Sequence, residues 1–164
     1  MGKGEPTGSA RSPSRDIAEM VVSGELERVS PNPRYVEQRL READESLKAA
    51  QMIRELEHSS ITASYDASRF AIDALVNWEG YRVPNRPGAH QSTIKFAEAR
   101  LSGVMSAEEI AGLDTLRTLR HAIEYPNPTR PPAPDPKGSD VSAAIELARR
   151  TVAAVKAEIK TPRQ

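Results

Sequence analysis

The sequence predicts an all-α protein, an antiparallel bundle of four to five helices. Apolar residues recur at steps of three and four along several segments, which is the period of an amphipathic helix. No segment alternates apolar and polar residues as a half-buried strand does. Glycines, prolines and helix-capping residues separate the helical segments from one another.

Length and composition restrict the class of protein. A chain of 164 residues is expected to form one domain. Lysine plus arginine equals aspartate plus glutamate, 23 of each, so no overall charge attracts nucleic acid and any RNA contact needs a local patch. No cysteine is present, and three scattered histidines predict no zinc site; we expect no cofactor. No apolar run approaches the ~20 residues of a membrane span, and no signal peptide is recognisable, which predicts a cytoplasmic protein without membrane contact.

The N-terminal residues offer almost nothing to bury. Residues 1–14 are rich in Gly, Ser and Pro, so we expect a disordered leader before a single domain at 15–164. A short amphipathic helix should follow, with Ile17, Met20 and Val21 on one side and Gly24 at its end.

Two long helices come next. Residues 34–57 carry one narrow apolar stripe, with Pro33 in the first turn. Residues 59–83 carry apolar side chains on two opposite faces, and their polar strip (Asp66, Arg69, Asp73 and Asn77) covers about a quarter of the circumference. This second helix should be central to the bundle. In so small a bundle, part of its apolar surface is expected to face a second subunit.

Prolines at 84 and 87 interrupt the chain before a helix at about 88–101. Ser106 and Glu109 then form a capping-box signature for a helix that runs to about Glu124.

The last connection is rich in proline. Residues 126–139 contain six prolines, and as polyproline II at ~3.1 Å per residue they could span ~40 Å, the length of a bundle. Ser139 or Asp140 should cap the last helix, whose apolar stripe runs from Val141 to Ile159.

The strongest candidate site lies at the end of the helix that precedes these prolines. Arg117, Arg120, His121 and Glu124 share one arc of that helix, and Arg120 lies at the edge of the apolar stripe. Arg120 therefore either extends to solvent or faces a polar cleft. A purely structural interpretation exists, because cations near a helix C-terminus are stabilised by the macrodipole and Arg120 can pair with Glu124 at i,i+4. The functional interpretation is binding of RNA or of a partner protein.

A second basic patch could form in the proline-interrupted loop from Arg82, Arg86 and His90, although such residues are often only solvated. Tyr65, Trp78 and Tyr81 could stack on bases, or serve as core or dimer contacts.

The segment Arg120-His-Ala-Ile-Glu-Tyr125 resembles the signature of the HEPN family, the prokaryotic and eukaryotic nucleotide-binding domain. That signature is an arginine, a polar residue, three further residues and a histidine. The run 64–83, with its loop to His90, and the segment 47–50 are also similar to HEPN sequences. The resemblance covers about residues 34–125.

The resemblance implies a bundle that forms a homodimer, with the motif residues of two protomers facing each other across a cleft. Active HEPN proteins are metal-independent ribonucleases, in which the histidine transfers a proton and the arginine stabilises charge on the phosphate. Here Tyr125 stands in place of the motif's histidine, and a tyrosine ordinarily titrates near 10.

Two functions follow from the resemblance. The first is an interaction protein with a degenerate site, the antitoxin of a nucleotidyltransferase-like toxin encoded nearby in a toxin–antitoxin or phage-defence module. The alternative is a metal-independent endoribonuclease toxin that uses Arg120, His121 and Tyr125.

Overall fold

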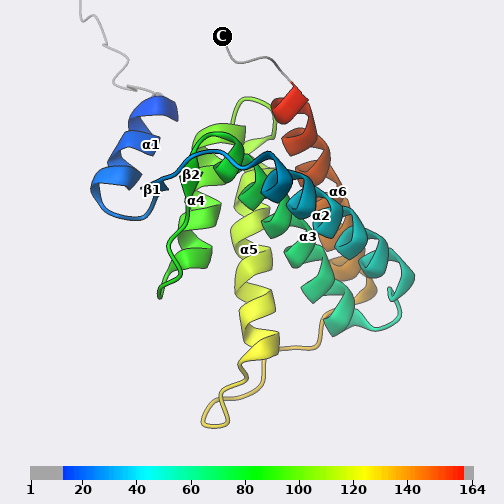
Figure 1. Ribbon diagram of the computed structural model, residues 1–164. Coiled ribbons are helices and arrows are strands. Elements are labelled where there is room, and N and C mark those ends of the chain that lie inside the picture. The colour runs from blue at the N-terminus through cyan, green and yellow to red at the C-terminus, as the bar shows by residue number, and fades with distance from the viewer. Residues whose placement is uncertain (1–12, 161–164) are drawn as a thin grey trace, which may run out of the picture.

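The computed structural model describes residues 13–160, which form six helices and a very small sheet (Figure 1). The mainly helical fold confirms the predicted class. The helices are α1 (Pro13–Val22), α2 (Pro33–Met52), α3 (Glu57–Trp78), α4 (Ala89–Leu101), α5 (Ala107–Glu124) and α6 (Gly138–Lys160). Strands β1 (Glu27–Arg28) and β2 (Tyr81–Arg82) pair in an antiparallel sheet, which the sequence analysis did not predict.

The expected leader lies almost wholly outside the described residues. Only Pro13 and Ser14 of it are described, and they belong to α1. Helix α1 packs against α4. It buries Ile17 and Met20, which the sequence placed on its apolar side. Gly24 follows with φ of +77°, a conformation that glycine adopts without strain.

Helix α3 is the central element, as predicted. It packs against α2, α4, α5 and α6, and eleven of its residues are buried. Tyr65, Ile72 and Leu75 are almost inaccessible, while Phe70 and Trp78 are partly buried and pack against the same core. The apolar surface of α3 is therefore covered within one chain. Helix α3 thus gives no support for a second subunit, and the homodimer stays a prediction.

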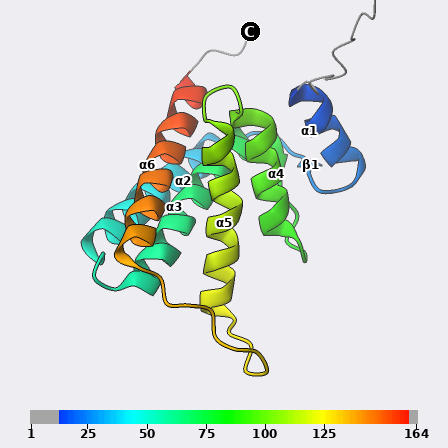
Figure 2. The same ribbon diagram turned by 180° about the vertical axis from the view of Figure 1, so that it is seen from behind.

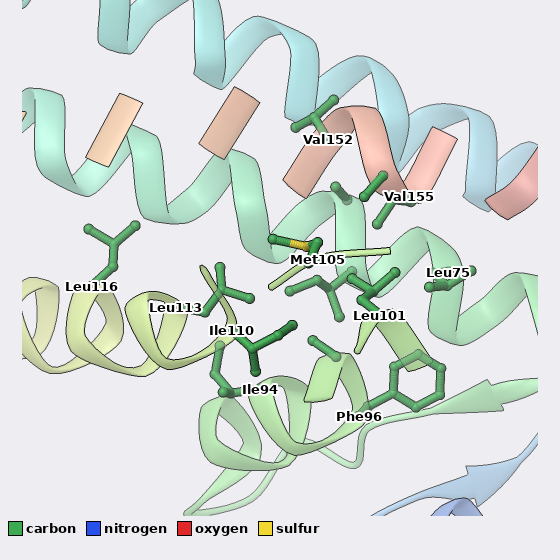
Figure 3. Packing of buried hydrophobic residues seen from close by; sticks show 14 of the residues in the cluster. Leu75, Ile94, Phe96, Leu101, Met105, Ile110, Leu113, Leu116, Val152 and Val155 are labelled. Carbon is green, nitrogen blue, oxygen red and sulfur yellow. The ribbon is translucent and has the colours of Figure 1, made fainter. Parts of the chain in front are cut away.

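The core continues between α3, α4, α5 and α6 (Figure 3). Phe96 and Leu101 of α4 and Leu113 of α5 are fully buried, and Met105, in the α4–α5 connection, is buried in the same cluster. Val155 of α6 closes the cluster from the other side. The packing fixes α4 and α5 side by side, which positions the site described below. Within the described residues, no helix is long and apolar enough to cross a membrane.

The boundary between α2 and α3 differs from the prediction. Asn32 caps α2 by accepting the backbone N–H groups of Arg34 and Tyr35, and Pro33 occupies the first turn as expected. The helix ends at Met52 instead of residue 57, and a tight turn leads into α3. No proline or glycine marks this turn in the sequence, so the apolar pattern gave no stop signal.

The end of α3 was also predicted too late. The helix stops at Trp78, and Gly80, at φ of +88°, turns the chain so that Tyr81–Arg82 pairs with β1. A Cβ at residue 80 would lie 3.3 Å from the Val29 carbonyl oxygen, so glycine also permits this close approach. Arg82 pairs with Glu27 on the neighbouring strand.

The start of α5 is as predicted. The Ser106 hydroxyl accepts the Glu109 N–H at 3.0 Å, and the Glu109 carboxylate accepts the Ser106 N–H at 3.0 Å. The helix ends at Glu124, with Tyr125 at its C-cap.

The proline-rich connection does not run along the bundle. Residues 126–137 form an exposed loop at one end, and α6 then returns antiparallel to α5 (Figures 1 and 2). The start of α6 was predicted slightly too late. The helix already begins at Gly138, so Ser139 and Asp140 lie inside it instead of capping it. Asp140 lies in its first turn, where its carboxylate accepts the Lys137 N–H at 2.7 Å.

Candidate functional site

A pocket of about 460 Å³ lies between α3, the first turn of α4 and the C-terminal half of α5. Its lining contains three arginines, two histidines and two tyrosines, and no acidic side chain is among the described residues that line it. We call it the cationic pocket, defined by its chemically distinctive residues Tyr65, Arg86, His90, Arg117, Arg120, His121 and Tyr125.

The structure brings most of the predicted site residues into this pocket. Arg117, Arg120, His121 and Tyr125 line it from α5 and its C-cap, and Arg86 lines it from the loop before α4. The other two predicted site residues lie elsewhere. Arg82 lies on β2 and lines a larger neighbouring cavity of about 550 Å³. Glu124 is not among the lining residues and acts on the pocket through Arg120.

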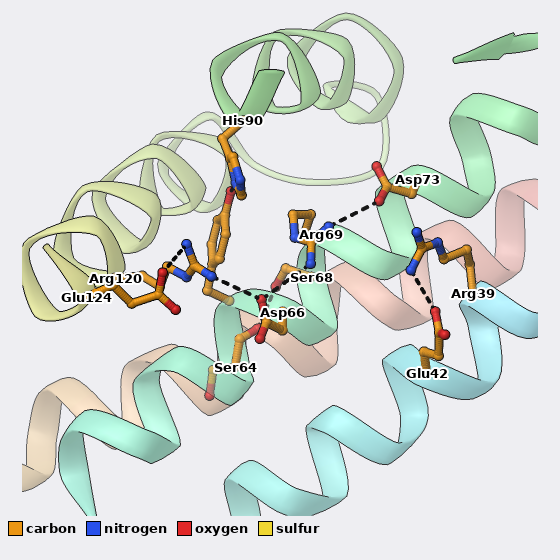
Figure 4. A network of polar contacts seen from close by, with 11 residues as sticks. Arg39, Glu42, Ser64, Asp66, Ser68, Arg69, Asp73, His90, Arg120 and Glu124 are labelled. Atoms are coloured by element: carbon orange, nitrogen blue, oxygen red, sulfur yellow. Dashed lines mark hydrogen bonds and ion pairs between the residues drawn. The ribbon is translucent and has the colours of Figure 1, made fainter. Parts of the chain in front are cut away.

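Arg120 faces a polar cleft, which decides between the two alternatives that the sequence left open. Its side chain is 17% exposed, and its guanidinium pairs with the Glu124 carboxylate at 2.7 Å (Figure 4). A second carboxylate, that of Asp66 on α3, lies 4.0 Å from the guanidinium. The guanidinium carbon is 5.6 Å from the centre of the Tyr65 ring, which adds a cation–π contact.

Arg117 lies one turn earlier on α5. Its Nε donates to the Asp114 carboxylate at 2.9 Å, and its side chain is largely buried. The structural interpretation of these two arginines is thus correct in part, because both form ion pairs along α5. Both arginines nevertheless line the pocket, whereas Asp114 and Glu124 do not.

Buried Tyr65 forms a hydrogen bond to the exposed His90, a contact that the sequence did not predict. The Tyr65 hydroxyl lies 2.7 Å from Nδ1 of His90, and the two rings stack with centres 5.7 Å apart. Burial raises the pKa of Tyr65 to about 12. Burial, followed by the charges of Arg69 and Arg120, lowers the pKa of His90 below its usual value. Both groups are therefore uncharged at neutral pH.

The first turn of α4 adds to the positive potential of the pocket. Gly88, at φ of +89°, starts this helix, and residues 88–91 line the pocket. The N-terminal end of a helix carries a partial positive charge, which favours anions.

His121 and Tyr125 also line the pocket. The centres of the two rings are 5.0 Å apart, and the ring planes are inclined to each other by 38°. The Tyr125 side chain is 63% exposed, and its backbone N–H ends α5 by donating to the His121 carbonyl. Tyr125 therefore lines the pocket and remains accessible.

A ladder of alternating charges crosses α3 beneath the pocket (Figure 4). Arg69 lies between Asp66 and Asp73, at 3.6 and 3.5 Å. Beyond it, Arg39 of α2 pairs with Glu42 at 2.8 Å. Burial raises the pKa of Asp73 to about 6, although Arg69 and Arg39 act in the opposite direction. The sequence showed these groups only as a polar strip of α3.

Several polar atoms at this contact have no hydrogen-bond partner among the described residues. They are Ser64 Oγ, Asp66 Oδ1, Arg69 Nε and Arg120 Nε, which all belong to α3 and the facing part of α5. An unsatisfied buried polar group costs about 1–3 kcal/mol, so such groups are rare and concentrate where function requires them.

The chemistry of the lining favours an anionic ligand. Arginines at the edge of a cavity bind phosphate and carboxylate oxygens through several N–H groups at once. In the described part of the chain, no group of three or more His, Asp or Glu side chains could hold a metal ion.

Comparison with the models of known protein families gives no match, and neither does comparison with curated protein sequences.

Proposed function

We propose that this chain is a HEPN-like binding protein and that its cationic pocket holds phosphate groups of RNA. The observation that carries this proposal is the gathering of Arg86, Arg117 and Arg120 in one pocket whose described lining has no carboxylate. The N-terminal end of α4 also lies at the pocket, and its partial positive charge favours phosphate. Because the whole chain has no formal net charge, the attraction is local to this pocket.

The form of RNA that fits best is a single strand. The exposed Tyr125 ring beside His121 offers a stacking surface for an unpaired base. Tyr65 does not offer one, because it is 1% exposed and bonded to His90.

Binding can be measured by the fluorescence anisotropy of a labelled single-stranded RNA of mixed sequence. Replacement of Arg117 or Arg120 by Gln should weaken binding and reduce the dependence of the logarithm of affinity on the logarithm of salt concentration by about one unit each. Arg149→Gln is the matched control, because Arg149 pairs with Glu146 on the exposed face of α6. Wild-type affinity in both pocket variants would disprove the site.

The resemblance adds a protein partner to this proposal. As an antitoxin, the chain would neutralise a nucleotidyltransferase-like toxin encoded nearby, and the exposed loop 126–137 supports a role in binding, since its side chains remain available. Co-expression and pull-down with the neighbouring gene product test this. Replacement of residues 126–137 by a Gly/Ser loop of equal length should reduce capture, while loss of toxicity control without loss of capture would point to another surface.

Cleavage of RNA is the second candidate function. The observation that favours it is that Arg120 and His121, which the family signature pairs along the sequence, line the same pocket together with Arg117. The reaction requires one group that removes a proton and another that supplies one. Toxicity of this chain expressed alone would support this candidate, and toxicity of the neighbouring gene product alone would support the antitoxin role.

A further inference from the structure

The cationic pocket contains two imidazoles. Only one of them, that of His121, belongs to the segment Arg120–Tyr125. His121 lies on α5 and His90 in the first turn of α4, and both line the pocket beside Arg117 and Arg120. We propose that His90 and His121 form an acid–base pair that cleaves the RNA held in this pocket without a metal ion. This inference rests on the RNA binding proposed above.

The Tyr65 contact prepares His90 to act as the base. When Nδ1–H of His90 donates to the Tyr65 oxygen, at 2.7 Å, the lone pair of Nε2 is left for the substrate. A base held by a third group is the usual arrangement in proton-transfer sites. Tyr65 is buried in the wall of the pocket, so it serves as a positioning residue for the imidazole.

Desolvation, followed by the net effect of the charges around it, lowers the pKa of His90. Arg69 on α3 and Arg117 and Arg120 on α5 lie on the sides that face it, and Asp66 opposes them. The result is a pKa below the usual value of histidine. A general base must be free of its proton at the working pH, and His90 meets this requirement at neutral pH.

The reaction needs no oxidant, reductant or added nucleophile. Nε2 of His90 removes the proton from the ribose 2′-hydroxyl, and the 2′-oxygen forms a bond to the adjacent phosphorus. The bond from phosphorus to the 5′-oxygen breaks, and the imidazole of His121, as the general acid, gives a proton to that oxygen. The products are a 2′,3′-cyclic phosphate and a 5′-hydroxyl, and Arg117 and Arg120 stabilise the negative charge that develops on the phosphate oxygens.

This arrangement would supply what Tyr125 does not. The second proton-transfer group comes from another helix instead of from the fifth position after Arg120. Residues 90 and 121 line the same pocket because α4 and α5 pack against each other and against α3.

Cleavage and binding are tested separately on the full chain in EDTA. A labelled single-stranded RNA reports cleavage at saturating concentration, and the same sequence with 2′-O-methyl groups reports binding. We expect wild type to produce cyclic phosphate ends, and His90→Gln and His121→Gln each to be slower by at least ~100-fold. His58→Gln is the matched control, because His58 pairs with Asp135 and does not line the pocket. Circular dichroism melting verifies that each variant is folded.

Tyr65→Phe tests the positioning role. In this variant the protonated form of His90 loses the hydroxyl that accepts its Nδ1–H, so the pKa of His90 should fall. The acid limb of the pH profile of kcat/KM should then move to lower pH, which a purely structural role of Tyr65 would not cause.

The outcomes separate the two proposals. If wild type binds the 2′-O-methyl RNA but leaves RNA intact, the acid–base pair is wrong and RNA binding stands. If His90→Gln cleaves as fast as wild type, His90 has no part in the reaction. If the 2′-O-methyl RNA does not bind, both proposals fail.

Discussion

Asp73 is a carboxyl group whose environment opposes its ionisation. Its side chain is 18% exposed, and burial raises its pKa from 3.8 to about 6. A carboxyl whose pKa is higher in the folded than in the unfolded state contributes stability that is fully present below its pKa in the unfolded state. This contribution is lost as pH rises through its pKa in the folded state. Since Asp73→Asn cannot ionise, its stability relative to wild type should increase between pH 3.8 and about 6, by up to about 3 kcal/mol.

Urea unfolding of both proteins at the two ends of this pH range measures the difference. Asp44→Asn serves as the control, because Asp44 is half-exposed and pairs with Lys156 on the surface. A stability difference that does not vary with pH would show that Asp73 ionises freely beside Arg69.

Glu124 controls the charge that Arg120 presents to the pocket. The carboxylate lies 2.7 Å from the guanidinium and outside the lining. Glu124→Gln removes a negative charge from the edge of the pocket, so RNA affinity should rise several-fold and its salt dependence should steepen. Anisotropy titrations at two salt concentrations test this, with Glu146→Gln on α6 as the control. Unchanged affinity would mean that RNA does not approach Arg120.

Residues that share a helix face could be predicted from the sequence, and residues that meet across the fold could not. Arg117, Arg120 and His121 lie together because helical spacing places them together. Tyr65 and His90 are 25 residues apart, and their hydrogen bond depends on where α4 packs against α3. The alternating charges around Arg69 could not be predicted for the same reason. Periodicity does not show how α2 and α3 are aligned against each other.

At the scale of elements, the capping box of α5 is the clearest test of a local signal. Ser106→Ala removes the acceptor of the Glu109 N–H, so the free energy of unfolding should fall by about 1 kcal/mol. Denaturant unfolding measures the change. Ser139→Ala in the first turn of α6 is the control, since Ser139 is exposed and does not cap that helix. An equal loss in both variants would indicate a general effect of serine removal.

Helix existence was predictable, and helix ends were predictable only where side chains mark them. Pro33, Ser106 and Gly24 gave correct boundaries, because each suits or redirects the backbone locally. The turn after Met52 has no such residue, and β2 forms because Gly80 lets the chain approach β1. Strand pairing over two residues leaves no periodic pattern.

At the scale of the whole molecule, the core is complete within one chain. Helix α3 is enclosed by four other helices, and α6 is tied to α2 by the Lys156–Asp44 pair at 2.7 Å. The large apolar side chains that stay exposed in the described part of the chain are distributed over separate segments: Val22, Met52, Leu56, Val104 and Tyr125. Of these, only Tyr125 lines the cationic pocket. A dimer therefore has to be argued from the pocket and not from an uncovered helix.

The homodimer implied by the HEPN resemblance stays a prediction, and the structure indicates how to test it. If the motif residues of two protomers face each other, the exposed Tyr125 ring is the natural aromatic anchor of that interface. Light scattering at micromolar concentration should then give about twice 17.9 kDa. Tyr125→Asp should return the mass to that of one chain, because a charge would be buried without a dedicated partner, and Met52→Asp, on a segment away from the pocket, should not. A wild-type monomer would rule out this interface and leave every group of the cationic pocket to act within a single chain.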